Sequence, residues 1–499
     1  MVGFMQNCTD DRTILYPTQD EEPRMSGETL YQQLVNEWTE LIQNGTVRPG
    51  ERLPSVRKAC AMHKVSPSTI LQTYRMLEDR GLIEARPQSG FYVKSAASLP
   101  LPRMRRQSAV HHTGEVVDQI EAVMGVQNQA DFIDLSLASP RGSDFYPTTR
   151  FKHIMGRLLR QQPELTTDYP FPPGSERLRR QIAQRAVSWG CVLAADELVI
   201  SNGCTEALQL ALRAVCKPGD TVGVESPTYF ALLPMLKDLG LAVIEIPTHP
   251  TSGLALDALE LLLSEKRLNA IVAMPTVHNP LGSTMPPEAK RRLAQLVNDY
   301  QVPLIEDAPH AELFYGAATP DAVKAYDRDG WVLLCSSYSK TLAPGFRIGW
   351  IAPGRFLSEV RRLKFSSSLG QPALLEETLA EYLESGGYDH HLRLIRRHFI
   401  SQMEKLRGAV AQHFPDGTRA TLPSGGCLLW VELPSHADTM ELFRAALAER
   451  ITVVPGAMYS AKGRYRNCLR LSCCYPWNDA YQRALVRVGE LAGELAGRG

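Results

Sequence analysis

The 499-residue sequence has no net charge and no long hydrophobic run. It carries 54 basic and 54 acidic side chains, and 44% of its residues are hydrophobic. A cancelled charge argues against a chain that is basic throughout, such as a nucleic-acid packaging protein, although a sum can hide a small basic part. No stretch approaches 18 uninterrupted apolar residues, so we expect no membrane-spanning role. The ordinary composition predicts about three domain lengths of globular protein.

Cysteine is also scarce. The ten cysteines are scattered without a C-x-x-C pair, which excludes a disulfide scaffold and a zinc finger and predicts no metal site. Reduced thiols in a cytoplasmic protein are the expected state. The first twenty residues contain the pair Asp10-Asp11 and no apolar run. We therefore expect no secretory signal and interpret residues 1–26 as a flexible leader.

Residues 27–94 have the pattern of a small helical domain with a β-like end. A first amphipathic helix is predicted from apolar residues at helical spacing: Tyr31, Leu34, Val35, Trp38, Leu41 and Ile42. A turn follows at Arg48-Pro49-Gly50, and a second helix is predicted to start at Pro54-Ser55.

Ser66-Pro67-Ser68 is a strong start signal for a third helix. In that helix we expect Ile70, Leu71, Tyr74 and Leu77 to face inward. Gly81 should end it, and residues 82–93 can pair as a two-stranded wing around residues 87–90.

The local charge favours a nucleic-acid contact for this domain. From Arg52 to Lys94 there are eight basic and three acidic side chains, a balance of 8 − 3 = +5, so the rest of the chain carries −5. A short helix that begins with small hydroxyl residues suits insertion into a major groove. The alternative is a three-helix bundle that serves protein contacts.

Residues 95–125 resemble an exposed linker, with Pro100, Pro102 and a basic run over 103–106. The predicted large domain covers residues 126–499. From about Phe132 onward, apolar runs of strand length alternate with helix-length segments, which is typical of a mostly parallel sheet covered on both faces. The predicted strands are 197–201, 220–225, 242–246, 270–274, 302–306 and 331–335, and two predicted helices are 205–215 and 287–297.

Several strand ends in this domain carry side chains that together suit one cofactor. Lys340 follows an apolar strand in a turn rich in hydroxyls, with Arg347 seven residues on. A lysine amine there could condense with an aldehyde cofactor, and hydroxyls with arginine could hold its phosphate. Asp307 and Asn279 also follow strands, and the start of a helix at 203–205 offers amides to an anion.

Each of these signals alone has an ordinary structural explanation. A strand-end aspartate is usually a cap, an N-P-x-G segment is usually a turn, and a loop lysine is usually solvated. Their joint occurrence at strand ends favours one cofactor site.

Two families are similar to parts of this chain. Residues 48–57 (RPGERLPSVR), 65–70 (VSPSTI) and 74–83 (YRMLEDRGLI) resemble the winged helix-turn-helix of the GntR regulators. The resemblance implies that Arg57, Ser66, Ser68 and Arg86 contact DNA.

From about Phe132 to Trp477, the order of the motifs resembles the fold-type I aminotransferases, which use pyridoxal 5′-phosphate (PLP). The implied fold is a large, mostly parallel α/β domain with a smaller α/β lobe. Lys340 resembles the Schiff-base lysine, and Asp307 the partner of the pyridine nitrogen. The resemblance implies further roles for Asn279 on the ring hydroxyl, Tyr229 stacked on the ring, Cys204, Thr205, Ser337 and Arg347 on the phosphate, Tyr169 on the phosphate across a dimer, and Arg470 on the substrate carboxylate.

One position departs from the aminotransferase pattern. The family usually has a tyrosine shortly after the aspartate, whereas this chain has Asp307-Ala308-Pro309-His310. His310 could still donate a hydrogen bond to the ring oxygen, and we expect its titration nearer neutral pH to change the tuning. The alternative is that His310 merely fills space.

The fusion of these two parts resembles the MocR subfamily of regulators. The resemblance implies a PLP-dependent transcription regulator of operator DNA, in which the cofactor, an amine or an amino acid shifts a conformational equilibrium. It also implies a domain-swapped, head-to-tail homodimer in the bacterial cytoplasm, associated with the nucleoid when bound to DNA. Two alternatives stay open: a working aminotransferase with a DNA-binding appendage, and an inactive dimerisation scaffold.

Overall fold

The structure is a computed structural model, and it divides into two compact units at Val93 and Lys94. It describes residues 29–43, 46–47, 50–80, 82–86, 90–94, 99–104, 110–111, 120, 125, 132–140 and 145–497. The expected leader and most of the expected linker therefore lie outside the described residues. So do Arg48, Pro49, Gly81 and the wing turn at residues 87–89.

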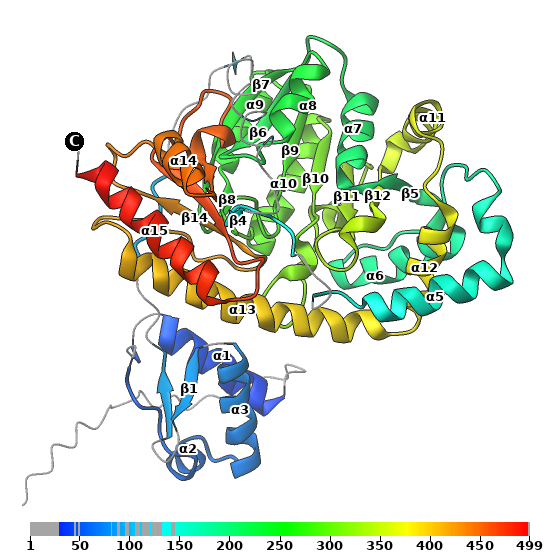
Figure 1. Cartoon of the computed structure of the whole chain (residues 1–499). Coiled ribbons are helices and arrows are strands. Elements are labelled where there is room, and N and C mark those ends of the chain that lie inside the picture. The colour runs from blue at the N-terminus through cyan, green and yellow to red at the C-terminus, as the bar shows by residue number, and fades with distance from the viewer. Residues whose placement is uncertain are drawn as a thin grey trace, which may run out of the picture. The chain divides into compact units, whose positions relative to one another are not determined.

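The first unit contains three helices and a two-stranded wing (Figure 1): α1 Leu30–Gln43, α2 Val56–His63, α3 Pro67–Asp79, β1 Ile83–Arg86 and β2 Gly90–Val93. Both later helices begin at serine caps. The Ser55 hydroxyl accepts a hydrogen bond from the Lys58 amide, and the Ser66 hydroxyl accepts one from the Thr69 amide. The wing strands are antiparallel, with Ile83 opposite Val93.

The core of this unit corrects one expectation about α3. Ile70, Tyr74 and Leu77 are buried as expected, but Leu71 is 39% exposed. The buried neighbour is Thr73, whose hydroxyl donates to the Thr69 carbonyl at 2.9 Å. With 3.6 residues per turn, positions 70, 73, 74 and 77 share one face and position 71 lies outside it. Thr73 can be buried because its polar group is satisfied within the helix.

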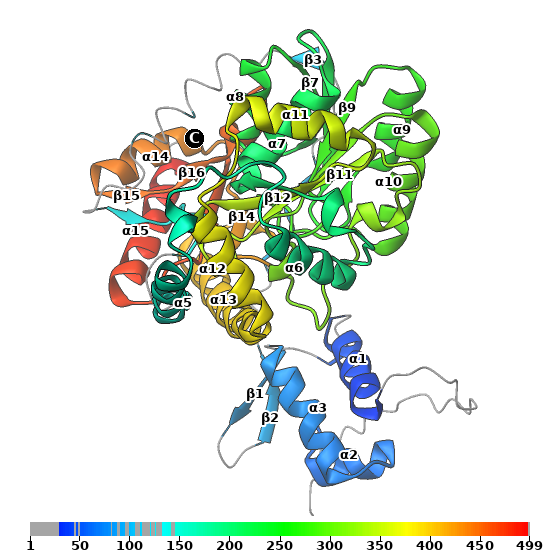
Figure 2. The same ribbon diagram turned by 90° about the vertical axis from the view of Figure 1, so that its right-hand side faces the viewer.

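The second unit is built on a nine-stranded sheet (Figure 2). Strands β7, β6, β9, β10 and β11 lie side by side and are parallel. At one side of the sheet, β12 runs antiparallel to β11, and β5 runs antiparallel to β12. The strands are β3 Val110–His111, β5 Val199–Asn202, β6 Thr221–Ser226, β7 Ala242–His249, β8 Gly253–Leu254, β9 Ala270–Ala273, β10 Leu304–Asp307, β11 Val332–Ser337 and β12 Ile348–Ala352.

Successive residues of the central strands enter two different cores. Val272 and Ile305 join one cluster, which includes residues of α7 (Gly203–Val215) and α8 (Leu232–Asp238). Ile271 and Leu304 join the other, with residues of α9 (Leu256–Ser264) and α10 (Pro287–Tyr300). Side chains alternate between the faces of a strand, so both faces of this sheet are covered by helices.

A smaller lobe and several helices complete the unit. The lobe has a four-stranded sheet in the order β13-β14-β17-β16 and a β4–β15 pair. Its strands are β4 Ile133–Asp134, β13 Arg419–Ala420, β14 Leu428–Glu432, β15 Ile451–Thr452, β16 Val454–Pro455 and β17 Cys468–Ser472. The remaining helices are α5 Thr148–Gln161, α6 Glu176–Ala186, α11 Leu357–Ser367, α12 Ala373–Glu384, α13 Gly387–His413, α14 Thr439–Ala448 and α15 Asp479–Ala496.

Each of the six strands predicted for this domain overlaps an observed strand, and both predicted helices are present. Strand β12 was not predicted; it follows the Lys340 turn and runs antiparallel to β11. Where the chain is described, no helix is both long and apolar enough to cross a membrane. The nine cysteines within the described ranges are free thiols.

Candidate functional site

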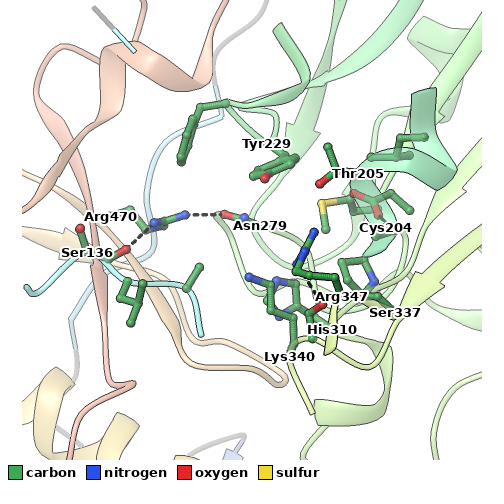
Figure 3. Close-up of a pocket in the computed structure, with 18 residues that line it drawn as sticks. Ser136, Cys204, Thr205, Tyr229, Asn279, His310, Ser337, Lys340, Arg347 and Arg470 are labelled. Carbon is green, nitrogen blue, oxygen red and sulfur yellow. Dashed lines mark hydrogen bonds between the residues drawn. The ribbon is translucent and has the colours of Figure 1, made fainter. Parts of the chain in front are cut away.

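A cavity of 240 Å³ lies at the carboxyl ends of the parallel strands (Figure 3). Side chains from β10, from the loops after β6, β9 and β11, and from the start of α7 reach it, together with β17 of the smaller lobe. Open α/β sheets bind ligands at this edge. The sequence-predicted residues that line the cavity are Cys204, Thr205, Tyr229, Asn279, Asp307, His310, Ser337, Lys340, Arg347 and Arg470.

Lys340 lies in the turn between β11 and a short 3-10 helix, Pro344–Phe346. Burial lowers the pKa of its amine; the Cys427 and Cys474 thiols oppose this shift, and the charges of Arg470 and Arg347 add to it. A lowered pKa raises the neutral, nucleophilic fraction of the amine at physiological pH. The site therefore offers an amine suited to attack a carbonyl.

Asp307 is the last residue of β10 and is almost fully buried. Its carboxylate accepts a hydrogen bond from the Cys204 thiol, with 3.0 Å between Oδ1 and Sγ. Burial raises the pKa of Asp307 to about 6, which the Cys204 hydrogen bond opposes and the charge of Glu225 increases. A buried carboxylate that is costly to ionise is well placed to pair with a cationic ring nitrogen.

The first turn of α7 lies at one end of the cavity. Gly203 has φ +69°, and a Cβ at this position would lie 2.5 Å from Nη2 of Arg347. Only glycine therefore allows the guanidinium to approach the helix start. Asn202 makes no side-chain capping bond to the first-turn amides, and Arg347 Nη1 donates to the Ser339 hydroxyl at 3.3 Å. Helix amides, hydroxyls and a guanidinium together suit a phosphate.

Arg470 stands at the other end of the cavity, on β17 (Figure 3). It is 2% exposed, and its guanidinium donates to Oδ1 of Asn279 at 3.3 Å and to the Ser136 carbonyl. Its Nε is buried without a hydrogen-bond partner among the residues that the structure describes. A buried guanidinium with an unpaired donor is suited to a ligand carboxylate.

His310 does not titrate near neutral pH. Burial lowers its pKa to about 3, and the charges of Lys340, Arg470 and His278 act in the same direction. The expectation that its titration near neutral pH tunes the site is wrong, because the imidazole stays neutral there. A neutral imidazole can still donate one hydrogen bond.

Tyr169 is the predicted residue that the structure does not bring to the cavity of its own chain. Its side chain is 78% exposed. Sequence reasoning missed Ser339, Phe230 and Ser136, which also line the cavity. Ser339 lies within the hydroxyl-rich turn, so that turn was its signal. Ser136 follows the short strand β4 and has no motif of its own.

The residues predicted to contact DNA are on the surface of the first unit. Arg57, Ser66 and Ser68 are exposed, and the Ser66 hydroxyl is hydrogen-bonded to those of Ser68 and Thr69. Arg86 is exposed but paired, because its Nε lies 2.8 Å from Oε1 of Glu84 and its guanidinium covers the Tyr92 ring at 4.4 Å.

Comparison with known proteins assigns both units. Residues 30–93 match the gntR family of bacterial regulatory proteins, and residues 133–488 match aminotransferase class I and II. Two Escherichia coli K12 proteins, the uncharacterized HTH-type transcriptional regulators YjiR and YdcR, are 37% and 35% identical; each alignment covers 93% of this chain, and 98% and 99% of the relatives. The chain is a MocR-type regulator of the GntR family.

The second unit of this MocR-type regulator has the fold of PLP-dependent aminotransferases. The solved α-aminoadipate aminotransferase LysN from Thermus thermophilus, complexed with N-(5′-phosphopyridoxyl)-L-leucine, aligns with a TM-score of 0.71 and 26% identity over 77% of this chain and 98% of that one. The donor set fits the same cofactor. An amine, a buried carboxylate and an anion site with a glycine cradle line one cavity in the MocR-type regulator.

Proposed function

We propose that cofactor and amino-compound binding in the second unit of this regulator controls operator binding by the winged unit. The observation that carries the proposal is the cavity, where the amine of Lys340, the carboxylate of Asp307 and the guanidinium groups of Arg347 and Arg470 all meet. A domain kept only as a scaffold has no need of this set of side chains, which disfavours the inactive alternative.

The chain's own residues would divide the work as follows. PLP, when bound, supplies an aldehyde that condenses with amines and a ring that accepts electrons. Lys340 would hold the aldehyde, and Asp307 would face the ring nitrogen. Arg347, with Ser337 and the amides of Cys204 and Thr205, would bind the phosphate.

On the opposite side of the cavity, the Nε of Arg470, which has no hydrogen-bond partner in the described part of the chain, would bind the carboxylate of an amino-acid effector. Such an effector shifts the DNA-binding equilibrium only as far as it binds two conformations with different affinity. Tyr229 would cover the ring, and Asn279 would bond its hydroxyl.

We also propose that the regulator acts as a head-to-tail, domain-swapped homodimer in the cytoplasm. The exposed side chains of Tyr169 (78%) and Phe171 (57%) support this, because they lie two residues apart and exposed apolar side chains that lie together mark interaction sites. Tyr169 would then reach the phosphate in the partner. If Tyr169→Phe binds PLP as tightly as the unchanged protein, this role is excluded.

The runner-up function is a working aminotransferase. Here the neutral, buried His310 stands in place of the usual tyrosine, which favours a slow reaction over a fast one. Turnover of a panel of amino acids with 2-oxo acids tests this alternative. We expect His310→Tyr to raise turnover, and a fast reaction in the unchanged protein would favour the enzyme.

The decisive experiment combines spectral titration with DNA binding. The purified protein is titrated with PLP, followed by its visible absorption band, and then with a panel of amines and amino acids. Affinity for an operator fragment is measured at each stage and at fixed salt. We expect at least one stage to change operator affinity. Identical affinity with and without cofactor and amines would reject the proposal.

A further inference from the structure

The turn that carries Lys340 is held from behind by helix α13. Thr341, the next residue, is 1% exposed and is bound twice. Its hydroxyl lies 2.7 Å from that of Tyr388, and its carbonyl accepts a hydrogen bond from Nε2 of His391 at 2.6 Å. Tyr388 and His391 lie in the first turn and a half of α13. The lysine turn is thus attached to this helix at both a side chain and the backbone.

The Tyr388 hydroxyl links this turn to a partly buried ion pair. It lies 2.5 Å from Oε2 of Glu312 and 2.7 Å from Oγ1 of Thr341, and it can donate its single proton to either oxygen. The other Glu312 oxygen lies 2.6 Å from Nη2 of Arg185, on α6. Each carboxylate oxygen of Glu312 therefore has a partner.

Glu312 also joins the network to a second segment that lines the cavity. It lies in the 3-10 helix Ala311–Leu313, directly after His310, and its backbone carbonyl accepts from Nε of Arg396 at 2.7 Å. The Tyr388 ring is 1% exposed and lies under the Arg185 guanidinium at 4.3 Å. One hydroxyl thus connects the segment bearing Lys340 with the segment bearing His310.

We propose that Tyr388 is a positioning residue for Lys340, acting through the hydrogen bonds of its hydroxyl with Thr341 and Glu312. Lys340 lies in a turn rather than in a helix or strand. The position of its amine in the cavity therefore depends on how firmly the turn is held. The network supplies this restraint without contacting the ligand. The proposal deepens the proposed function and rests on it for the role of Lys340.

The test variants remove single hydroxyls while keeping shape. Tyr388→Phe keeps the ring under Arg185 and removes both hydrogen bonds. Thr341→Val removes the other partner at nearly equal volume, and Thr341→Ser retains a hydroxyl. Tyr382→Phe, a buried tyrosine on the preceding helix α12 whose ring lies beside Arg150, is the matched control.

Two readouts separate positioning from simple stability. The first is PLP affinity from the visible band, which we expect to fall about 10-fold in Tyr388→Phe and in Thr341→Val. The second needs no cofactor: the rate at which trinitrobenzenesulfonate labels Lys340 in the cofactor-free protein, followed by peptide mass spectrometry. We expect a change of about 3-fold or more in the same two variants.

The double variant should show no greater loss than Tyr388→Phe alone, because Thr341→Val removes only an interaction that Tyr388→Phe already removes. Thr341→Ser and Tyr382→Phe should behave as the unchanged protein does. If the unchanged protein gives no visible band with PLP, the proposed function is rejected. The labelling rate still tests the positioning role in that case, because it needs no cofactor. Unchanged affinity and labelling in Tyr388→Phe, with only a lower Tm, would overturn the positioning role.

Discussion

The winged unit and the aminotransferase unit present their candidate functional residues in opposite ways. In the winged unit Arg57, Ser66, Ser68 and Arg86 are exposed and come from one short stretch of sequence. In the second unit, Asp307 and Arg470 are 3% and 2% exposed and come from strands far apart in the chain. A DNA phosphate can be contacted by exposed side chains, whereas the pKa of an amine or a carboxylate shifts strongly when burial removes water from it. A single substitution in the cavity should therefore cause a large loss of PLP binding. A single substitution on the DNA-facing surface should cause only a moderate loss of operator affinity.

The largest expected effect is at Lys340. Lys340→Ala should abolish the visible band that a cofactor held through this lysine gives, because no other amine lines the described cavity. Absorption spectra before and after PLP addition measure this. The cofactor-free Lys340→Ala variant should still bind the operator. Loss of operator binding would show that DNA binding by the winged unit depends on Lys340.

Asp307→Asn should separate affinity from stability. We expect PLP affinity to fall by about 100-fold or more, because the ring nitrogen loses its anionic partner. The cofactor-free variant should nevertheless be more stable at pH 7.5. Burial raises the pKa of Asp307 from 3.8 to about 6. The folded state therefore favours the protonated carboxyl, so its contribution to stability is complete below pH 3.8 and is lost as the pH rises through about 6.

Two pKa units at 1.36 kcal/mol each amount to about 3 kcal/mol. Thermal unfolding of the cofactor-free proteins between pH 4 and 8 measures this effect. The unchanged protein should lose stability across this range relative to Asp307→Asn. Parallel pH profiles for the two proteins would contradict the assignment of a costly buried charge.

Arg57→Ala should weaken operator binding by about 10-fold and reduce its salt dependence by about one counterion. Titrations of an operator fragment at several salt concentrations measure both quantities. PLP affinity should not change. Arg160→Ala, which removes an exposed arginine from α5, is the charge-matched control and should leave DNA binding unaltered.

The smallest effect is expected at Arg86. The guanidinium of Arg86 is paired with Glu84 and covers the Tyr92 ring. The neighbouring carboxylate offsets part of its positive charge, so less of that charge attracts DNA. Arg86→Ala should weaken operator binding by only about 2- to 3-fold. A loss as large as that of Arg57→Ala would show that the wing contacts DNA more directly than its ion pair indicates.

Local signals in the sequence predicted the elements that carry the site. Serine caps and proline predicted the start of α3, and apolar runs predicted the strands that end at Asp307 and before Lys340, because these signals act within a few residues. The face of α3 was predicted less well. Leu71 is more apolar than Thr73, but helix geometry and one hydrogen bond to Thr69 place the threonine inside.

The sequence alone determined the kinds of chemistry available to this protein: an amine at Lys340, carboxylates at strand ends, a glycine at a helix start, and hydroxyls at the start of a short helix in a basic segment. Only the tertiary structure decided which of these meet and in what state. Three features depend on groups far away in sequence: the lowered pKa of His310, the hydrogen bonds of Arg470 to Asn279 and Ser136, and the bonds of Thr341 to α13. The reason is physical, since burial and hydrogen-bond partners are properties of the folded chain.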